Sequence, residues 1–115
     1  MLEIVLHFAF KVYKRYRKIT TTIKGKRYKL WIADTPKKKK LGLSPLIDLP
    51  RGWGMIFNYD TDVDHGFTME KTKIPLTIIF LDNNFNIVDS FNCRPGQKGS
   101  IKPRDGKKYR HVIEI

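Results

Sequence analysis

Cysteine is almost absent from the sequence, with Cys93 as its single example. A lone cysteine excludes an intrachain disulfide and a zinc site built from several thiolates. Long apolar runs are missing as well, since none approaches the roughly 18 residues that a membrane-spanning helix needs. The first apolar run follows Glu3 and precedes the cations, which reverses the order of a secretory signal. We therefore predict a soluble protein without a cleaved leader, located in the cytoplasm.

Acidic residues are scarce: 11 Asp or Glu stand against 23 Lys or Arg in 115 residues, for a net charge of +12. The length suits one domain, because a chain of this size buries about two-thirds of its unfolded surface in a single core. The hydrophobic content of 41% is too high for intrinsic disorder. We predict a single domain over residues 1–115, made of an apolar and basic extension (1–18) and a β-sandwich (19–115).

Most of the positive charge lies in one segment. Residues 11–40 contain 13 Lys or Arg and one acidic residue, Asp34, so this segment carries +12 and the rest of the chain sums to zero. Such asymmetry favours a polyanionic partner, either nucleic acid or another polyanion. A purely solvated surface would have the same composition, and both interpretations stay open.

Aromatic residues alternate with these cations, which is typical of sequence-tolerant single-strand binding: rings stack on bases while cations neutralise phosphates. In the strand expected over residues 28–33, Leu30 and Ile32 should point inward, so the alternation turns Trp31 outward. The predicted anion-binding residues are Lys11, Lys14, Arg15, Arg17, Lys18, Lys24, Lys26, Arg27, Lys29, Trp31, Lys37, Lys38, Lys39 and Lys40.

Strand signals dominate from residue 19 onward. Runs of β-branched and aromatic residues predict strands over 19–23, 28–33, 55–57, 75–81, 85–91 and 109–115, with the run at 75–81 central and buried. Turn residues at 24–26 and 82–84 predict two hairpins. Several short strands with frequent turns indicate an all-β, single-domain β-sandwich of jelly-roll or barrel-like character, with at most one or two short helices.

Four other segments complete the expected organisation. Asp34 or Thr35 should cap a short helix that begins at Pro36. The polar residues 60–66 are expected to form a connection, and the Gly- and Pro-rich residues 94–108 a loop. Residues 2–10 fit either a helix or a strand, because their apolar spacing suits the former and their β-branched and aromatic content the latter.

The order of short motifs resembles the uncharacterised family called domain of unknown function 192, over about residues 28–115. The matching pieces are Ile32–Pro36, Gly42-Leu43, Gly54–Phe57, Phe67–Met69, Thr72, Ile74–Asp82 and the closing Tyr109–Ile115. The resemblance implies a compact β-sandwich and no enzymatic activity. The chain departs from the family pattern at Thr68, Lys71 and Thr77, where the family tends to have Trp, Asn and Asp. Small family members occur in tailed phages, which would place a phage-encoded version in the virion.

No residue pattern predicts a catalytic centre or a cofactor. Asp60, Asp62 and Asp64 start like a calcium loop, but His65 and Lys71 occupy the positions that require Gly and Glu. A weak oxygen-ligand site and a solvated acidic loop both remain open there. His7, His65 and His111 are far apart in sequence. Cys93 precedes Arg94, whose charge could activate the thiol, but no histidine partner is evident. We predict a non-enzymatic binding or structural domain.

Three alternatives to nucleic-acid binding remain. The apolar residues 2–10 and the cations of 11–18 could associate peripherally with an anionic membrane. A small ligand could bind beside residues 60–72, or an unrecognised enzyme could use that loop, and either requires a concave pocket there. Self-association is also possible if the N-terminal segment is a strand donated to a second copy.

Overall fold

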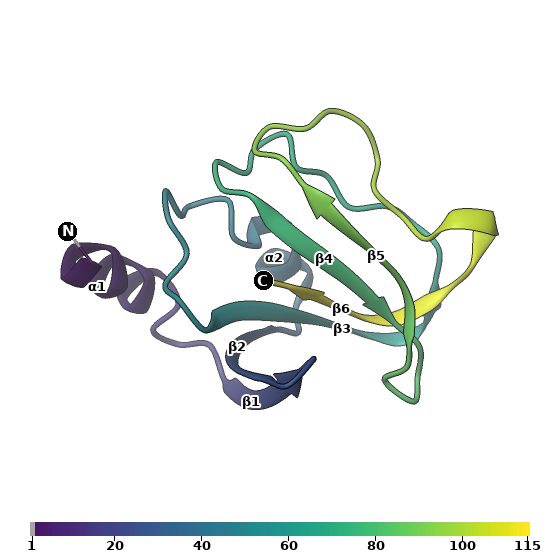
Figure 1. The fold of residues 1–115 in the computed structure, drawn as a ribbon, viewed down its shortest axis with the longest axis horizontal. Coiled ribbons are helices and arrows are strands. Elements are labelled where there is room, and N and C mark those ends of the chain that lie inside the picture. Colours follow the sequence, from purple (N-terminus) through teal and green to yellow (C-terminus); the bar gives the residue numbers. More distant parts are fainter. Residues whose placement is uncertain (1) are drawn as a thin grey trace.

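The structure, a computed structural model, describes residues 2–115, and their side chains from His7 onward. Two α-helices and six strands follow one another along the chain (Figure 1). Their bounds are α1 Leu2–Val12, β1 Lys18–Ile23, β2 Lys26–Ala33, α2 Pro36–Leu41, β3 Trp53–Val63, β4 Leu76–Leu81, β5 Ile87–Cys93 and β6 Tyr109–Glu114, with a short 3-10 turn, η1, at Arg104–Gly106. The predicted mostly-β class with two short helices is confirmed.

All six strands belong to one mixed sheet with the order β1-β2-β3-β6-β4-β5. The only parallel pair is β2 with β3, and α2 lies in the connection between them. The remaining pairs are antiparallel. Strand β4 lies between β6 and β5 and has five buried residues of six, which confirms the central buried strand.

Both faces of this sheet are covered. The larger core contains Ala9 of α1 and Tyr13, which directly follows this helix, together with Trp31, Phe57 and Phe80 of the sheet. A smaller core on the opposite face contains alternate residues of the same strands, Leu30, Ile56, Ile79, Leu81 and Ile113. The sheet curls around this second core, because Ile23 of edge strand β1 and Ile87 of edge strand β5 line a common cavity. The domain therefore has the barrel-like character expected from the sequence.

Local sequence accounts for the turn and the helix that were predicted. The hairpin β1–β2 turns at Lys24 and Gly25, with φ values of 50° and 81°, the two positive φ angles of a two-residue turn. Thr35 caps α2 through its side chain, which accepts the backbone N–H of Lys38, and Pro36 follows as the first helical residue. These choices place the cationic residues 37–40 on α2.

Two expectations need correction. Residues 2–12 form a helix, so the idea that this segment is a strand donated to a second copy is wrong. Residues 60–63 belong to β3 instead of a connection, because β3 continues along β6 past a bulge and Val63 pairs with Tyr109. Polar composition misled the prediction here, since this end of β3 is exposed and its backbone is satisfied by its neighbour.

Candidate functional site

Trp31 is buried, which overturns its predicted role as an outward-facing base-stacking residue. Only 1% of its surface is exposed, and its ring lies 4.6 Å from the ring of Trp53 on one side and 4.6 Å from that of Tyr13 on the other. Alternation failed because both faces of β2 are buried at this point, Leu30 in one core and Trp31 in the other. Tyr13 is also 1% exposed and therefore holds α1 against the sheet.

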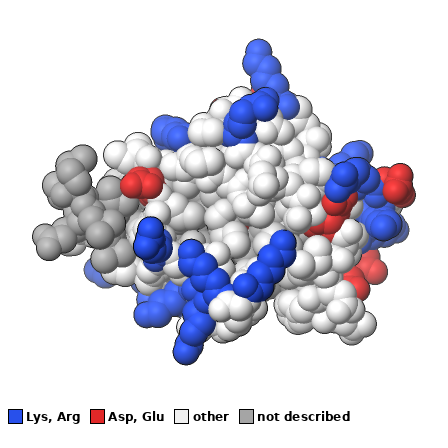
Figure 2. All heavy atoms as spheres, viewed as in Figure 1, with Lys and Arg blue, Asp and Glu red and all other residues white. Residues whose placement is uncertain are grey.

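Further out along the hairpin, the face that Trp31 shares becomes polar and basic. The pairs Lys18–Trp31, Thr20–Lys29 and Thr22–Arg27 place these side chains on the same face, since paired residues of antiparallel strands point the same way. We call Lys18, Arg27 and Lys29, with Thr20 and Thr22 opposite Lys29 and Arg27, the basic strip. All five residues are exposed, and Lys and Arg side chains are visible over this hairpin in Figure 2.

Aromatic rings lie beside the basic strip. Lys18, Thr20 and Lys29 share a shallow hollow of about 400 Å³ with Phe10 and Trp53. The two rings contact each other edge to face at 5.0 Å, and the Lys29 ammonium lies 5.7 Å from the ring centre of Trp53. The sequence predicted that Trp31 lies at this surface. In the structure the half-buried Trp53 reaches the surface, whereas Trp31 is buried beneath it.

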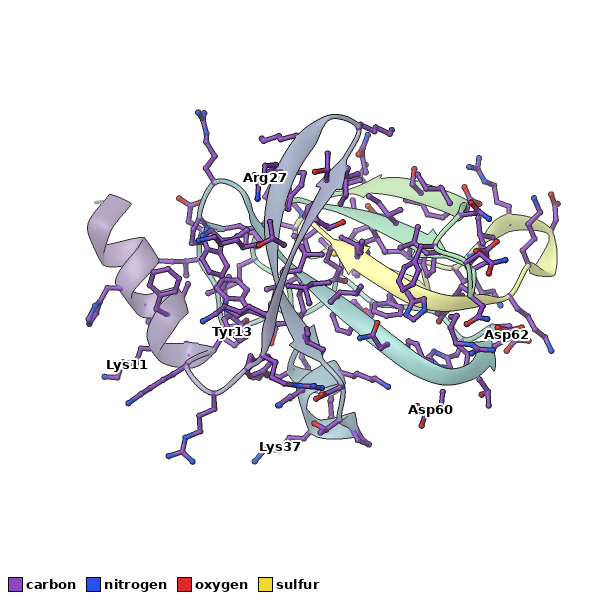
Figure 3. The ribbon with its side chains drawn as sticks, turned by 90° about the horizontal axis from the view of Figure 1, so that it is seen from below. Lys11, Tyr13, Arg27, Lys37, Asp60 and Asp62 are labelled. Atoms are coloured by element: carbon purple, nitrogen blue, oxygen red, sulfur yellow. The ribbon has the colours of Figure 1, made fainter. Side chains whose placement is uncertain are left out.

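The other predicted cations come from separate elements. Figure 3 shows Lys11 on α1, Arg27 on the hairpin and Lys37 on α2. Two of the remaining cations are paired: Arg17 forms a salt bridge with Asp34, and Lys38 lies 3.5 Å from the same carboxylate. The Arg17 hydrogen bond is the main reason why the pKa of Asp34 is lowered. Asp34 therefore neutralises part of the segment's charge.

A pocket of about 330 Å³ lies at α2, β3 and the following loop. Phe57, Tyr59 and Phe67 contribute aromatic walls, and Lys39, Lys40 and Lys71 contribute cations. The loop side also includes His65, Gly66, Thr68 and Thr72, and the α2 side Leu41–Ser44. The concave pocket required by the small-ligand alternative is therefore present beside residues 60–72. Thr68 and Lys71, two positions at which the chain departs from the family pattern, both line it.

Glu114 of β6 also lines this pocket and is the one buried charged residue of the described chain, with 5% of its surface exposed. Among the described residues it makes no ion pair and no side-chain hydrogen bond. No fully enclosed side-chain oxygen or nitrogen of the described chain lacks a hydrogen-bond partner, so the carboxyl group of Glu114 opens onto the pocket. Burial raises the pKa of Glu114 to about 8, and the acid form predominates at neutral pH.

The predicted acidic loop does not form a cation site in the described chain. Asp62 accepts a hydrogen bond from Arg110 at 3.0 Å, and Asp60 points outward from β3 (Figure 3). Within residues 2–115 no group of three or more His, Cys, Asp or Glu is arranged to hold a metal ion. His65 contacts the Tyr109 hydroxyl through Nδ1 at 3.2 Å, and Thr68 contacts Glu70. His65 is thus engaged by Tyr109 and Thr68 by Glu70, and neither forms a hydrogen bond with the other.

Cys93 is a buried thiol with 4% exposure. Burial is the main cause that raises its pKa, and the nearby Glu114 raises it further. The activation by Arg94 that the sequence suggested would require a lowered pKa and is therefore not observed.

The fold and these surfaces define a small mostly-β domain with one curled six-stranded sheet, a basic strip on a hairpin and a pocket with a buried acid. Its family follows from sequence comparison: the model of DUF192, described as "Uncharacterized ACR", matches residues 19–115. The chain belongs to this family, which confirms the resemblance noted above and extends it upstream to include β1. No curated protein sequence matches the chain.

Two solved structures share the fold. One is a Sinorhizobium meliloti 1021 protein described provisionally as a transcription regulator, with 22% identity, a TM-score of 0.73, and coverage of 87% of this chain and 81% of that one. The other is a protein of unknown function from Novosphingobium aromaticivorans DSM 12444, with 21% identity, a TM-score of 0.69, and coverage of 90% and 84%. At such identities the similarity concerns the fold alone.

The membrane alternative keeps its status as a prediction. None of the helices described is long and apolar enough to cross a membrane. On α1, Ala9 is fully buried against the sheet, whereas Phe8 and Phe10 are 43% and 39% exposed. One face of the helix therefore packs in the core, and two phenylalanines remain partly exposed at the surface.

Proposed function

We propose that the protein is a non-enzymatic binding domain whose basic strip binds single-stranded nucleic acid. The observation that carries the proposal is the row of exposed Lys18, Arg27 and Lys29 beside the rings of Trp53 and Phe10. Single-strand binding uses the same combination, cations that follow the phosphate backbone and aromatic rings on which bases stack.

The spacing of the strip supports this partner. Side chains on one face of a strand repeat about every 6.6 to 6.8 Å, which is comparable with the phosphate spacing of an extended single strand. Among the described residues, none of the three cations has a carboxylate within salt-bridge distance, unlike Arg17 and Lys38. Their charge is therefore free to neutralise phosphates. Thr20 and Thr22 add hydroxyl donors between the cations.

The absence of enzymatic activity is part of the proposal and rests on the geometry of the described candidates. Cys93 is buried with a raised pKa, and His65 is engaged by Tyr109 instead of a hydroxyl nucleophile. A nucleophile is activated by an adjacent base or by a lowered pKa, whereas the pKa values of the Cys93 thiol and of the Tyr109 hydroxyl beside His65 are both raised.

The test is fluorescence anisotropy with a labelled oligothymidylate at two salt concentrations. Three phosphate contacts predict a log–log salt slope of about −2, so binding should weaken roughly 20-fold between about 50 and about 200 mM salt. Replacing Arg27 and Lys29 together with Ala leaves one of the three contacts, and the same salt change should then weaken the residual binding only about threefold.

The matched control is the double variant Lys107→Ala, Lys108→Ala, which removes two exposed cations near η1, far from the hairpin in the fold (Figure 1). It should keep the salt slope of the unmodified protein. An equal loss in the two double variants, or no binding at low salt, contradicts the proposal. Binding to acidic vesicles without binding to the oligonucleotide would also contradict it, in favour of the membrane alternative.

A further inference from the structure

We propose that the pocket at α2, β3 and residues 65–72 is a second, separate binding site, for a small organic anion with a flat N–H-bearing body, of which mononucleotides are the representative class. This site goes beyond the proposed function, because it shares no residue with the basic strip or with the hollow beside it. Three features of the pocket carry the assignment: its walls, its cations and its buried acid.

The size and walls suit a flat molecule. A volume of about 330 Å³ falls at the lower end of the range found for small-molecule sites, about 300 to 1,000 Å³. Phe57 and Phe67 contact each other edge to face at 5.1 Å and form one side of the pocket, to which Tyr59 adds a third ring. A heteroaromatic ring packs well against such walls, since aromatic groups pack favourably edge to face or offset.

The cations predict a negative charge on the ligand. Lys40 and Lys71 are exposed and belong to two different segments that both line the pocket. Lys39 lies over the ring of Tyr59 at 4.0 Å, which keeps its ammonium at the pocket wall. No described carboxylate pairs with any of these three lysines. A phosphate or carboxylate group of a ligand would supply the missing counter-charge.

Glu114 predicts N–H groups on the ligand. The residue is 95% buried by area and lines the pocket, and its carboxyl group makes no hydrogen bond within the described chain. A buried polar group without a partner is costly, and a ligand that donates to it removes that cost. Carboxylates accept hydrogen bonds from the amino groups of bases, as acidic side chains do from cytosine. Guanine adds a ring N–H beside its amino group, so that two donors can meet the two oxygens of the ionised carboxylate, and its binding would release the proton that Glu114 holds at neutral pH.

The test is titration calorimetry of the full-length protein with guanosine monophosphate, with guanosine and inorganic phosphate as partial ligands. The complete nucleotide should bind at least tenfold more tightly than either part, because only it engages both the lysines and Glu114. Glu114→Gln keeps the side-chain size but places an amide N–H against the donors of the base. Its affinity for the nucleotide should fall at least tenfold, while its circular dichroism spectrum should match that of the unmodified protein.

Variants at the pocket rim separate this site from general charge effects. Lys71→Ala should weaken binding of the nucleotide severalfold, whereas Lys37→Ala, which removes an exposed lysine of α2 outside the pocket, should leave it unchanged. The proposal is overturned if the nucleotide does not bind at millimolar concentration, if Glu114→Gln binds it normally, or if the two lysine variants behave alike. It is also overturned if Arg27→Ala with Lys29→Ala abolishes binding, since the nucleotide would then occupy the basic strip. The salt dependence of oligonucleotide binding tests the basic strip, whereas nucleotide binding tests the pocket. The two proposals can therefore be refuted separately.

Discussion

The buried acid Glu114 should make the stability of the protein fall as pH rises from about 5 to about 8. Burial raises its pKa from 4.5 to about 8 in the folded state. Between these two values the folded protein holds a proton that the unfolded chain has released. The free energy of unfolding therefore decreases with increasing pH across this window, the opposite of what a salt-bridged carboxylate would cause.

The magnitude follows from the shift of about 3.5 pKa units. At about 1.36 kcal/mol for each unit, burial of the ionised form costs at most about 5 kcal/mol above pH 8. Only about 1 kcal/mol of that cost is present at pH 5, where the acid is protonated in the folded state and about three-quarters ionised in the unfolded chain. Between pH 5 and pH 8 the difference is about 3 kcal/mol.

Glu114→Gln isolates this contribution, because glutamine has no proton to release. Urea unfolding of both proteins at pH 5 and pH 8 gives four free energies of unfolding. Between pH 5 and pH 8 the free energy of the unmodified protein should fall by about 3 kcal/mol relative to that of the variant. At an m-value of about 1.5 kcal/mol/M this corresponds to roughly 2 M in the urea midpoint. Tyr13, Tyr59 and Cys93, whose pKa values are raised and which Glu114 influences, stay neutral over this range. Parallel stability profiles for the two proteins would refute the reasoning.

Three further predictions concern the core. Trp31→Ala should lower the free energy of unfolding by about 3 to 5 kcal/mol in denaturant titration, because a fully buried indole is removed. The control Lys29→Ala removes an exposed side chain and should change this free energy by less than about 0.5 kcal/mol. Equal effects of the two substitutions would place Trp31 at the surface. Gly54→Ala should lower the melting temperature by more than about 10 °C, since its Cβ would clash with the backbone carbonyl oxygen of Glu114. A shift of only two or three degrees would contradict this contact. Cys93 should react with a thiol reagent at least about 100-fold faster in denaturant than in the native protein, and rapid native labelling would show that the thiol is accessible.

Much of the sheet could be predicted from the sequence because its strands are locally encoded. The β-branched residues 19–23, the turn at Gly25 and the apolar run at 75–81 each carry their own signal, and all three predictions are confirmed. The N-terminal helix carries no such signal. Its residues suit both spacings, and the contact that decides for a helix, burial of Ala9 and Tyr13 against the larger core, is tertiary.

The candidate sites were harder to predict, because each depends on which face of a strand is covered. Alternation assumes one buried face, but β2 is buried on both, so it assigned Trp31 to the wrong environment. The pocket had one overlooked signal in the terminal strand. Glu114 is two residues from Val112, a core residue, so the alternation of the strand places its acidic side chain on the same buried face. The lysines and rings that surround it come from other elements, and only the fold brings them together.

The N-terminal helix lies outside the family match, yet it is tied to both candidate sites. The ring of Tyr13 packs on Trp31, which in turn packs on Trp53 beside the basic strip. The Tyr13 hydroxyl donates a 2.7 Å hydrogen bond to the carbonyl oxygen of Gly42, which lines the pocket. Removal of the N-terminal segment would therefore take away the hydrogen-bond donor that Gly42 meets at the pocket wall. Ala9 and Tyr13 pack in the larger core, so in this chain the family's sheet contacts a helical segment that the family match does not include.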